Sequence, residues 1–428
     1  MEEKTTITVN EKEPLLSVQH LEQFFKLGHH TLRAVNDVNF DIYKGEVFGL
    51  VGESGCGKTT TGRSIIRLYN ITGGSIYFKG QRIGAGIRRY KEAVKVKKAE
   101  TSAQIIALQN EIKANPENAE LAQTNNEKIK ALNAELDEFM VKQTQEIQSA
   151  RHDQKYCNED YAKKEVEKVD EKYKPLLEQA SEEEKPQLEK EYKEARKLAS
   201  KDRIMNKMQM IFQDPIASLD PRMTVRETIA EGLIIRGIKD KKVIDEQVYK
   251  MLDLIGLVPE HAGRYPHEFS GGQRQRIGIA RAIVLEPELI IADEPISALD
   301  VSIQAQVINL LNELREKLGL TILFISHDLS VVKYFSDRIA VMYYGNIVEM
   351  ATSDQLFAHP LHPYTKSLLS AIPLPDPNYE RQRTRIVYNP IAEHDYSVDK
   401  PSMREVEPGH TVYCNEEEFK RYLAEIKK

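Results

Sequence analysis

Tryptophan is absent from this chain of 428 residues, and cysteine is scarce. Cys56, Cys157 and Cys414 lie far apart and form no CxxC pair. This spacing argues against a zinc site or a disulfide framework, and it fits a reducing compartment. Long apolar runs are also missing, and the N-terminus has neither a basic start nor an apolar stretch. We therefore expect no membrane-spanning helix, no signal peptide and a cytoplasmic location.

Neither positive nor negative charge predominates, since the net charge is only −6. That balance gives no general attraction to nucleic acid or to acidic lipid. Hydrophobic residues make up 41% of the chain, which is typical of a globular protein with a normal core.

Glycine is absent between Gly86 and Gly232, and a charged segment occupies much of this interval. Residues 89–203 contain 25 acidic and 23 basic residues, and apolar residues such as Leu132, Leu136 and Phe139 recur at helical spacing. This pattern predicts an antiparallel coiled coil or a helical hairpin. Asn115-Pro116 and the pair Ser181/Glu184 suggest helix starts. A disordered polyampholyte is the alternative.

The other segments alternate between strand-like and helix-like patterns. Short apolar runs such as "EVFGLV", "LIIAD" and "TILFIS" predict buried strands, with helices at 224–257 and 302–317. Such alternation predicts an α/β fold with a mostly parallel sheet. We divide the chain into a first core part at 1–86, an inserted helical segment at 87–203, a second core part at 204–350 and a peripheral C-terminal extension at 351–428.

The stretch "GESGCGKT" carries the strongest single motif. It satisfies G-x-x-x-x-G-K-[ST] and lies between a predicted strand and a predicted helix, as a phosphate-binding loop requires. Backbone N–H groups there bind nucleotide phosphates, Lys58 reaches the β- and γ-phosphates, and Thr59 binds Mg²⁺. The nucleotide-contacting residues expected here are Gly52, Glu53, Ser54, Gly55, Cys56, Gly57, Lys58, Thr59 and Thr60.

The stretch "LIIADEP" supplies the second half of a phosphoryl-transfer site. Asp293 ends a buried strand and is expected to hold Mg²⁺, while Glu294 follows it directly. Phosphoryl transfer depends mainly on positioning and charge stabilisation. Glu294 is therefore the candidate that orients or deprotonates the attacking water.

Four further stretches accompany these two: "IFQDP", "FSGGQRQR", "SALD" and "ISHD". In this order and spacing the chain closely resembles the ATP-binding-cassette (ABC) family over about residues 15–82 and 205–350. The resemblance implies an ABC nucleotide-binding domain with a RecA-like core, an antiparallel β subdomain and an α-helical signature subdomain. The inserted segment is a departure, because this connection is normally short.

The resemblance also implies roles for single residues. Gln213 is the Q-loop glutamine, which approaches Mg²⁺ and water and couples to the membrane partner. His327 contacts the γ-phosphate, and Asp300 belongs to the D-loop. Phe25 stacks on adenine, with Phe24 as the competing choice. The signature motif, expected to touch ATP bound by a partner chain, comprises Ser270, Gly271, Gly272 and Gln273.

A narrower resemblance lies in "HPLHPYTKSLLSAIP", "EPGHTVYC" and "YPHEFSGGQRQR". These stretches are similar to the ATPase subunits of oligopeptide and dipeptide importers, and more to the F-type than to the D-type. That implies ATP and Mg²⁺ as cofactors. The implied partners are a D-type ATPase subunit, two membrane permease subunits and, indirectly, an extracytoplasmic peptide-binding protein, with no nucleic acid. The implied location is the cytoplasmic face of the membrane. Some relatives carry an iron–sulfur cluster, but only Cys414 lies near this C-terminus, so no cluster is expected.

Two other classes remain as alternatives. ABC ATPases of DNA repair also contain coiled coils, but after the Q-loop, and translation factors carry two cassettes in one chain. Here Gln213 follows the insertion, and only one phosphate-binding loop is present. A non-hydrolysing regulatory cassette is the other alternative, and Glu294 is the residue that argues against it.

Overall fold

The computed structural model describes residues 13–372 and 386–426. Its main sheet has the strand order β11-β12-β10-β9-β3-β8-β7-β6. The central strands are parallel, as the sequence predicted, and they are β9 (Arg338–Tyr343), β3 (Val47–Val51), β8 (Thr321–Ser326), β7 (Leu289–Asp293) and β6 (Met208–Ile211).

The parallel strands are apolar on both sides because both faces of the sheet are covered. Along β8, Ile322 and Phe324 join one core cluster, while Leu323 and Ile325 join another. Helices α8 (Val301–Leu318) and α9 (Leu329–Phe335) contribute to the first cluster, and α1 (Lys58–Ile65) contributes to the second. The carboxyl ends of β3, β7 and β8 consequently meet at one edge of the sheet.

A second, antiparallel sheet has the order β2-β1-β4-β5. It consists of β1 (Leu16–Leu27), β2 (His30–Ile42), β4 (Gly73–Phe78) and β5 (Gln81–Ala85). The hairpin of β1 and β2 is longer than the sequence runs suggested, because its outer turn is solvent-exposed and carries few apolar residues.

The predicted helical stretch at 224–257 is two helices, α5 (Val225–Ile235) and α6 (Lys241–Leu254). They pack with α7 (Gly271–Ile283) through Ile229, Val248 and Ile277, which are all buried. Two short 3₁₀ turns, η2 (Pro259–Gly263) and η3 (Pro266–Glu268), lead into α7.

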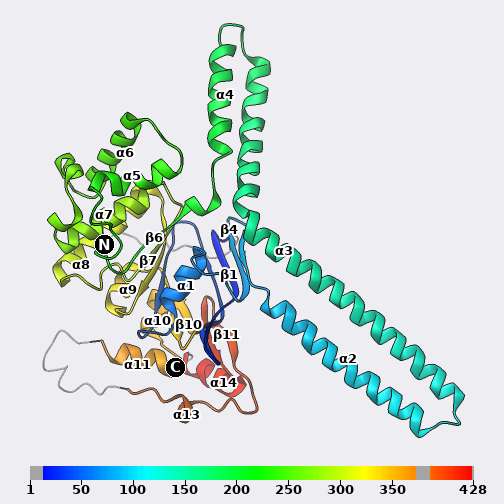
Figure 1. Ribbon diagram of the computed structural model, residues 1–428. Coiled ribbons are helices and arrows are strands. Elements are labelled where there is room, and N and C mark those ends of the chain that lie inside the picture. Colours follow the sequence, from blue (N-terminus) through cyan, green and yellow to red (C-terminus); the bar gives the residue numbers. More distant parts are fainter. Residues whose placement is uncertain (1–12, 373–385, 427–428) are drawn as a thin grey trace.

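The charged segment is helical, and its helices project from the rest of the molecule in two arms (Figure 1). Helix α3 (Ala119–Gln179) runs through both arms; α2 (Arg88–Ala114) lies along its first part and α4 (Lys185–Ala199) along its last part. Side-chain hydrogen bonds join the paired helices within each arm, Lys97 to Glu135 in the first and Tyr192 to Asp170 in the second. The short turn η1 (Ile204–Lys207) then leads into β6.

Two of the expected helix starts are placed differently. Asn115 ends α2, and Asn118 is the residue that caps α3, since its side chain accepts a hydrogen bond from the Leu121 amide. Ser181 does hydrogen-bond with Glu184, but this turn precedes α4. Asn-Pro and Ser/Glu patterns mark chain turns as well as caps, which explains both misplacements.

The C-terminal extension is less peripheral than the sequence suggested. Its strands β11 (Ser402–Glu407) and β12 (His410–Cys414) extend the main sheet next to β10 (Asn346–Thr352). The junction is a buried ion pair, in which His410 Nε2 lies 2.8 Å from Glu349 Oε1. The extension also contains α10 (Ser353–Ala358), α11 (Pro363–Ser370), α13 (Pro390–Glu393) and α14 (Glu416–Ile426).

Candidate nucleotide-binding site

The phosphate-binding loop connects β3 to α1 and requires glycine at its ends. A Cβ on Gly52 would lie 2.2 Å from Met342 O, and a Cβ on Gly57 would lie 2.3 Å from Ala34 O. Both glycines also have positive φ angles, which side-chain-bearing residues rarely adopt. Lys58 is buried, and its ammonium group donates to the carbonyls of Gly52 and Glu53 at 2.7 and 2.8 Å. The loop is therefore a tight backbone cradle closed by the lysine.

Thr59 and Asp293 meet beside this cradle. Thr59 Oγ1 donates to Asp293 Oδ1 at 2.7 Å, although the two residues are far apart in sequence. Burial raises the pKa of Asp293, and the hydrogen bond from Thr59 opposes that shift. Asp293 Oδ2 is buried and has no hydrogen-bond partner in the described part of the chain. An unpartnered carboxylate oxygen next to a threonine hydroxyl fits a magnesium ion.

Gln213, Glu294 and His327 come together at the same edge of the sheet. Gln213 Nε2 donates to Glu294 Oε2 at 3.0 Å, and His327 Nδ1 lies 3.1 Å from that oxygen. Glu294 has a φ of 45°, a left-handed conformation that is costly for a residue with a side chain. Such strain is common where a turn directs a functional group into a site. The structure thus brings two of the three predicted catalytic side chains, Gln213 and His327, to the carboxylate of the third, Glu294.

The two neighbouring phenylalanines on β1 have different surroundings. Phe25 makes an edge-to-face contact with Tyr69, with ring centroids 5.3 Å apart. Phe24 instead lies beneath the guanidinium group of Arg88, 4.6 Å from the ring centroid. Tyr69 follows the helix that begins at the phosphate-binding loop. Phe25 thus contacts the segment that follows α1, whereas the face of Phe24 is covered by Arg88.

The stretch Ser270–Gln273 forms the start of α7. Ser270 and Gln273 make a reciprocal capping box, with the Gln273 amide donating to Ser270 Oγ. Gly272 is packed closely, because a Cβ there would lie 2.5 Å from Ile303 Cγ2. In the described residues, no hydrogen bond or ring contact joins this stretch to the phosphate-binding loop. Asp300 caps α8 nearby without a side-chain hydrogen bond to that helix.

Comparison with known families decides the identity of this arrangement. The ABC transporter family model matches residues 35–196 and 176–297. The chain belongs to the ABC transporter ATP-binding family. A second model, for the C-terminal region of oligopeptide/dipeptide transporters, matches residues 348–398. The expected resemblance is thereby confirmed, and this ABC protein is an ATPase of the transporter type.

Several curated ABC proteins are similar over nearly their whole length. The oligopeptide transport ATP-binding protein OppF of Bacillus subtilis is 46% identical over 96% of this chain and 99% of its own. OppF of Streptococcus mutans is 43% identical over 97% and 99%, respectively. The dipeptide transport ATP-binding protein DppF of Lactococcus lactis is 40% identical over 97% and 98%.

One contact of this ABC ATPase was not foreseen from the sequence. Tyr364 of the C-terminal extension reaches the phosphate-binding loop, and its hydroxyl accepts a hydrogen bond from the Glu53 amide at 3.0 Å. His362 positions this tyrosine by accepting a hydrogen bond from its amide. The stretch "HPLHPYT" carries part of the family resemblance, but no pattern in it indicates a contact with a loop over 300 residues earlier.

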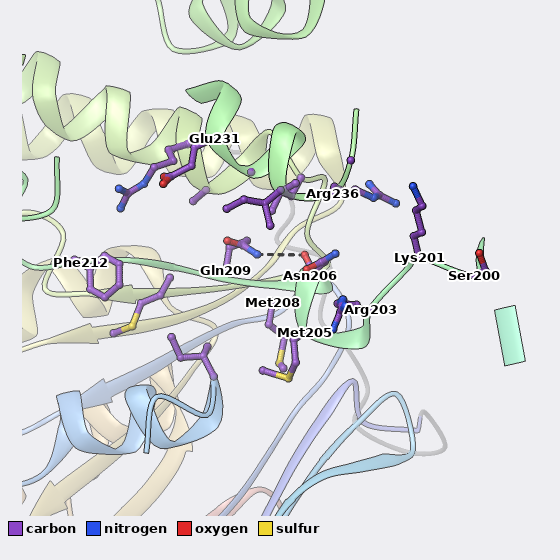
Figure 2. A pocket seen from close by; sticks show the side chains of 18 residues that line it. Ser200, Lys201, Arg203, Met205, Asn206, Met208, Gln209, Phe212, Glu231 and Arg236 are labelled. Carbon is purple, nitrogen blue, oxygen red and sulfur yellow. Dashed lines mark hydrogen bonds between the residues drawn. The ribbon is translucent and has the colours of Figure 1, made fainter. Parts of the chain in front are cut away.

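A cavity of ≈640 Å³ is lined by none of the phosphate-binding-loop residues 52–60 (Figure 2). Its walls come from the end of the inserted segment, from β6 and from the helices α5 and α7. Lining residues include Lys201, Arg203, Phe212, Glu231, Ile235 and Arg236. In the described residues, no helix of the ABC ATPase is long and apolar enough to cross a membrane.

Proposed function

We propose that this chain binds and hydrolyses ATP to power the import of oligopeptides or dipeptides through an ABC transporter. The observation that carries the ATPase part is the convergence of Gln213 and His327 on Glu294 beside the phosphate-binding loop. The peptide part is supported by the names of the relatives and by the match to the oligopeptide/dipeptide C-terminal region.

The loop residues 52–60 hold the phosphates through their amides, and Lys58 neutralises the β- and γ-phosphates. Thr59, Asp293 and Gln213 hold Mg²⁺, which supplies charge neutralisation on the phosphate oxygens. Glu294 orients the attacking water and takes up its proton. His327 donates a hydrogen bond to the γ-phosphate, and Phe25 stacks on adenine.

The chain works as half of a head-to-tail dimer. Ser270–Gln273 lie at an exposed helix start and have no contact with their own phosphate-binding loop among the described residues, so they can serve a nucleotide held by another chain. Asp300 lies at the start of the helix against which Gly272 packs, and it acts at the same interface. The partner is a second, D-type ATPase subunit.

The chain docks on two transmembrane permease subunits at the cytoplasmic face of the membrane, and a peptide-binding protein takes part only through them. The docking surface is the cavity of Figure 2, because Phe212 in its wall directly precedes Gln213, the residue that the family resemblance couples to the membrane partner. Ile235 at this cavity is 79% exposed, which is unusual for so large an apolar side chain. A permease segment that fills the cavity would bury it. Residues 87–203 are an insertion within the ATPase domain, and nucleic acid is not a partner.

Affinity purification of the tagged chain from detergent-solubilised membranes, followed by mass spectrometry, tests this assembly. We expect a second ABC ATPase and two membrane subunits. Ile235→Asp is expected to lose the membrane subunits and to keep nucleotide binding. Tyr334→Asp is the control, since Tyr334 is similarly exposed on α9 and does not line the cavity. Recovery of ribosomes or DNA in place of membrane subunits would refute the proposal.

A further inference from the structure

The helix after the phosphate-binding loop is followed by Arg67, whose left-handed backbone conformation is unfavourable for a residue with a side chain. Arg67 has a φ of 62°, and the Leu68 and Arg67 amides donate to the carbonyls of Arg63 and Ser64 at 2.9 and 3.1 Å. This pair of bonds is the Schellman arrangement, whose left-handed position is usually occupied by glycine. An arginine in that position costs conformational energy, so its side chain needs a compensating contact.

The compensating contact comes from the middle of the insertion. Arg67 donates to Cys157 Sγ at 2.8 Å and also to the backbone carbonyl of Gln154. The side-chain amide of Gln154 donates a hydrogen bond to Asn70 Oδ1 at 2.8 Å. Cys157 and Tyr161 of the same helix belong to a core cluster of the cassette. This part of α3 is thus fixed to the cassette, in contrast to the two projecting arms.

Gln154 therefore holds residues on both sides of Tyr69. Tyr69 is the ring that contacts Phe25 edge to face. An aromatic pair of this geometry contributes to the position of both rings. Through Arg67, Asn70 and Tyr69, the insertion restrains Phe25, the side chain proposed to stack on adenine.

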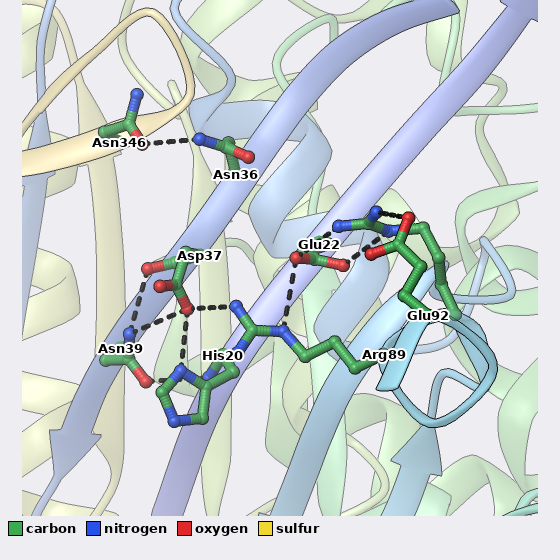
Figure 3. A network of polar contacts seen from close by, with 9 residues as sticks. His20, Glu22, Asn36, Asp37, Asn39, Arg89, Glu92 and Asn346 are labelled. Atoms are coloured by element: carbon green, nitrogen blue, oxygen red, sulfur yellow. Dashed lines mark hydrogen bonds and ion pairs between the residues drawn. The ribbon is translucent and has the colours of Figure 1, made fainter. Parts of the chain in front are cut away.

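The start of the insertion holds the same strand from its other side. Arg88 donates two hydrogen bonds to the carboxylate of Glu22, at 2.9 and 2.7 Å, and its guanidinium group covers Phe24. Arg89 bridges Glu22 and Asp37, which joins β1 to β2 (Figure 3). Glu22 is buried, so these charge-assisted bonds satisfy a carboxylate that water cannot reach.

We propose that the insertion positions the adenine-binding strand: its first turn and the middle of α3 hold Phe24 and Phe25 from opposite sides. Gln154, Arg67 and Arg88 are positioning residues, and the nucleotide they serve is one with an aromatic base. The inference rests on the proposed contact between Phe25 and adenine. The projecting arms are not needed for this role.

Binding of MgADP and of magnesium pyrophosphate to the full chain, measured by isothermal titration calorimetry, tests the proposal. ADP has the base that Phe25 contacts, whereas pyrophosphate has only the phosphates. Arg67→Gly relieves the left-handed strain and removes the contact with α3, so the helix end is retained. We expect Arg67→Gly and Gln154→Ala to weaken ADP binding roughly 3- to 10-fold, the scale of one aromatic contact. Pyrophosphate binding is expected to stay the same.

Two controls separate the outcomes. Lys97→Ala removes an ion pair within an arm and is expected to leave both affinities unchanged. Unchanged ADP affinity in Arg67→Gly and Gln154→Ala overturns the proposal, and so does an equal loss for both ligands, which would point to the loop as a whole. Phe25→Ala tests the underlying contact. If it leaves ADP binding unaltered, the adenine assignment of the proposed function fails, and this inference fails with it.

Discussion

Replacing Tyr364 with phenylalanine removes one atom from the contact between the C-terminal extension and the phosphate-binding loop. The tyrosine is 2% exposed, and its ring packs 4.4 Å from the Tyr343 centroid. Burial raises the pKa of Tyr364, so the hydroxyl stays protonated at physiological pH. Phenylalanine preserves the ring packing and removes only the acceptor of the Glu53 amide.

The expected magnitude depends on what replaces that acceptor. A fully buried amide left without a partner costs about 1–3 kcal/mol, whereas an ordinary hydrogen bond contributes about 0.5–1.5 kcal/mol. Glu53 is exposed, so water can reach its amide once the hydroxyl is gone. The lower range therefore applies. We expect the variant to bind MgADP about 2- to 10-fold more weakly, because 1.4 kcal/mol corresponds to a factor of ten.

The assay compares Tyr364→Phe with Tyr388→Phe by calorimetric titration of MgADP. Tyr388 belongs to the same aromatic cluster, with its ring 5.6 Å from that of Tyr364. Its hydroxyl has no hydrogen-bond partner in the described part of the chain, so loss of that hydroxyl is expected to leave the affinity unchanged. Equal affinities in both variants and the unaltered protein would refute the reasoning that the extension supports the loop.

Three further variants test other parts of the account. Gly57→Ala forces a side chain against Ala34 O at positive φ, a strain of about 1–3 kcal/mol before the clash is counted, so both nucleotide binding and the melting temperature are expected to fall. Normal binding would contradict the cradle geometry. Ser270→Ala is expected to leave the chain's own MgADP affinity unchanged while ATP hydrolysis by the assembled complex falls roughly 10²-fold, the scale of one lost transition-state contact; unchanged hydrolysis would argue against a shared site. Burial lowers the pKa of His362 to about 3, so folding excludes a proton that the unfolded chain takes up below pH 6.5. Stability is therefore lost as pH falls from 6.5 towards 3, by about 1 kcal/mol between pH 6.5 and 5.5. Denaturant unfolding of His362→Asn, which keeps a helix-capping acceptor, should show a correspondingly flatter pH dependence.

The core elements could be predicted because local pattern and tertiary structure agree. β7 and β8 are apolar throughout and buried on both faces, so composition alone marks them as strands. The positions of the glycines in the phosphate-binding loop could be predicted as well, since their backbone conformation disfavours other residues. The helical character of the charged segment followed from its periodicity. Its division into two arms did not, because a thin apolar stripe does not specify which helices pair.

The contacts of the site with distant segments could not be predicted. The Tyr364 hydroxyl reaches the Glu53 amide from α11, and the Leu361 and His362 amides just before this tyrosine donate to the buried carboxylate of Glu349. Arg67 is similar, since nothing in its neighbourhood indicates that its partner is a helix 90 residues later. Such contacts depend on tertiary packing, and no local propensity encodes them.

Peptide uptake can be measured in proteoliposomes that contain this chain, its partner ATPase and the permease subunits, with the peptide-binding protein supplied outside. This measurement shows whether the chain powers peptide import. We predict that uptake requires ATP inside the vesicles. Glu294→Gln in this chain should keep MgATP bound and reduce turnover and uptake by at least ~10²-fold, because the water loses its orienting carboxylate. Uptake and hydrolysis near the unaltered level in that variant would contradict the assignment of Glu294, and with it the proposed mechanism.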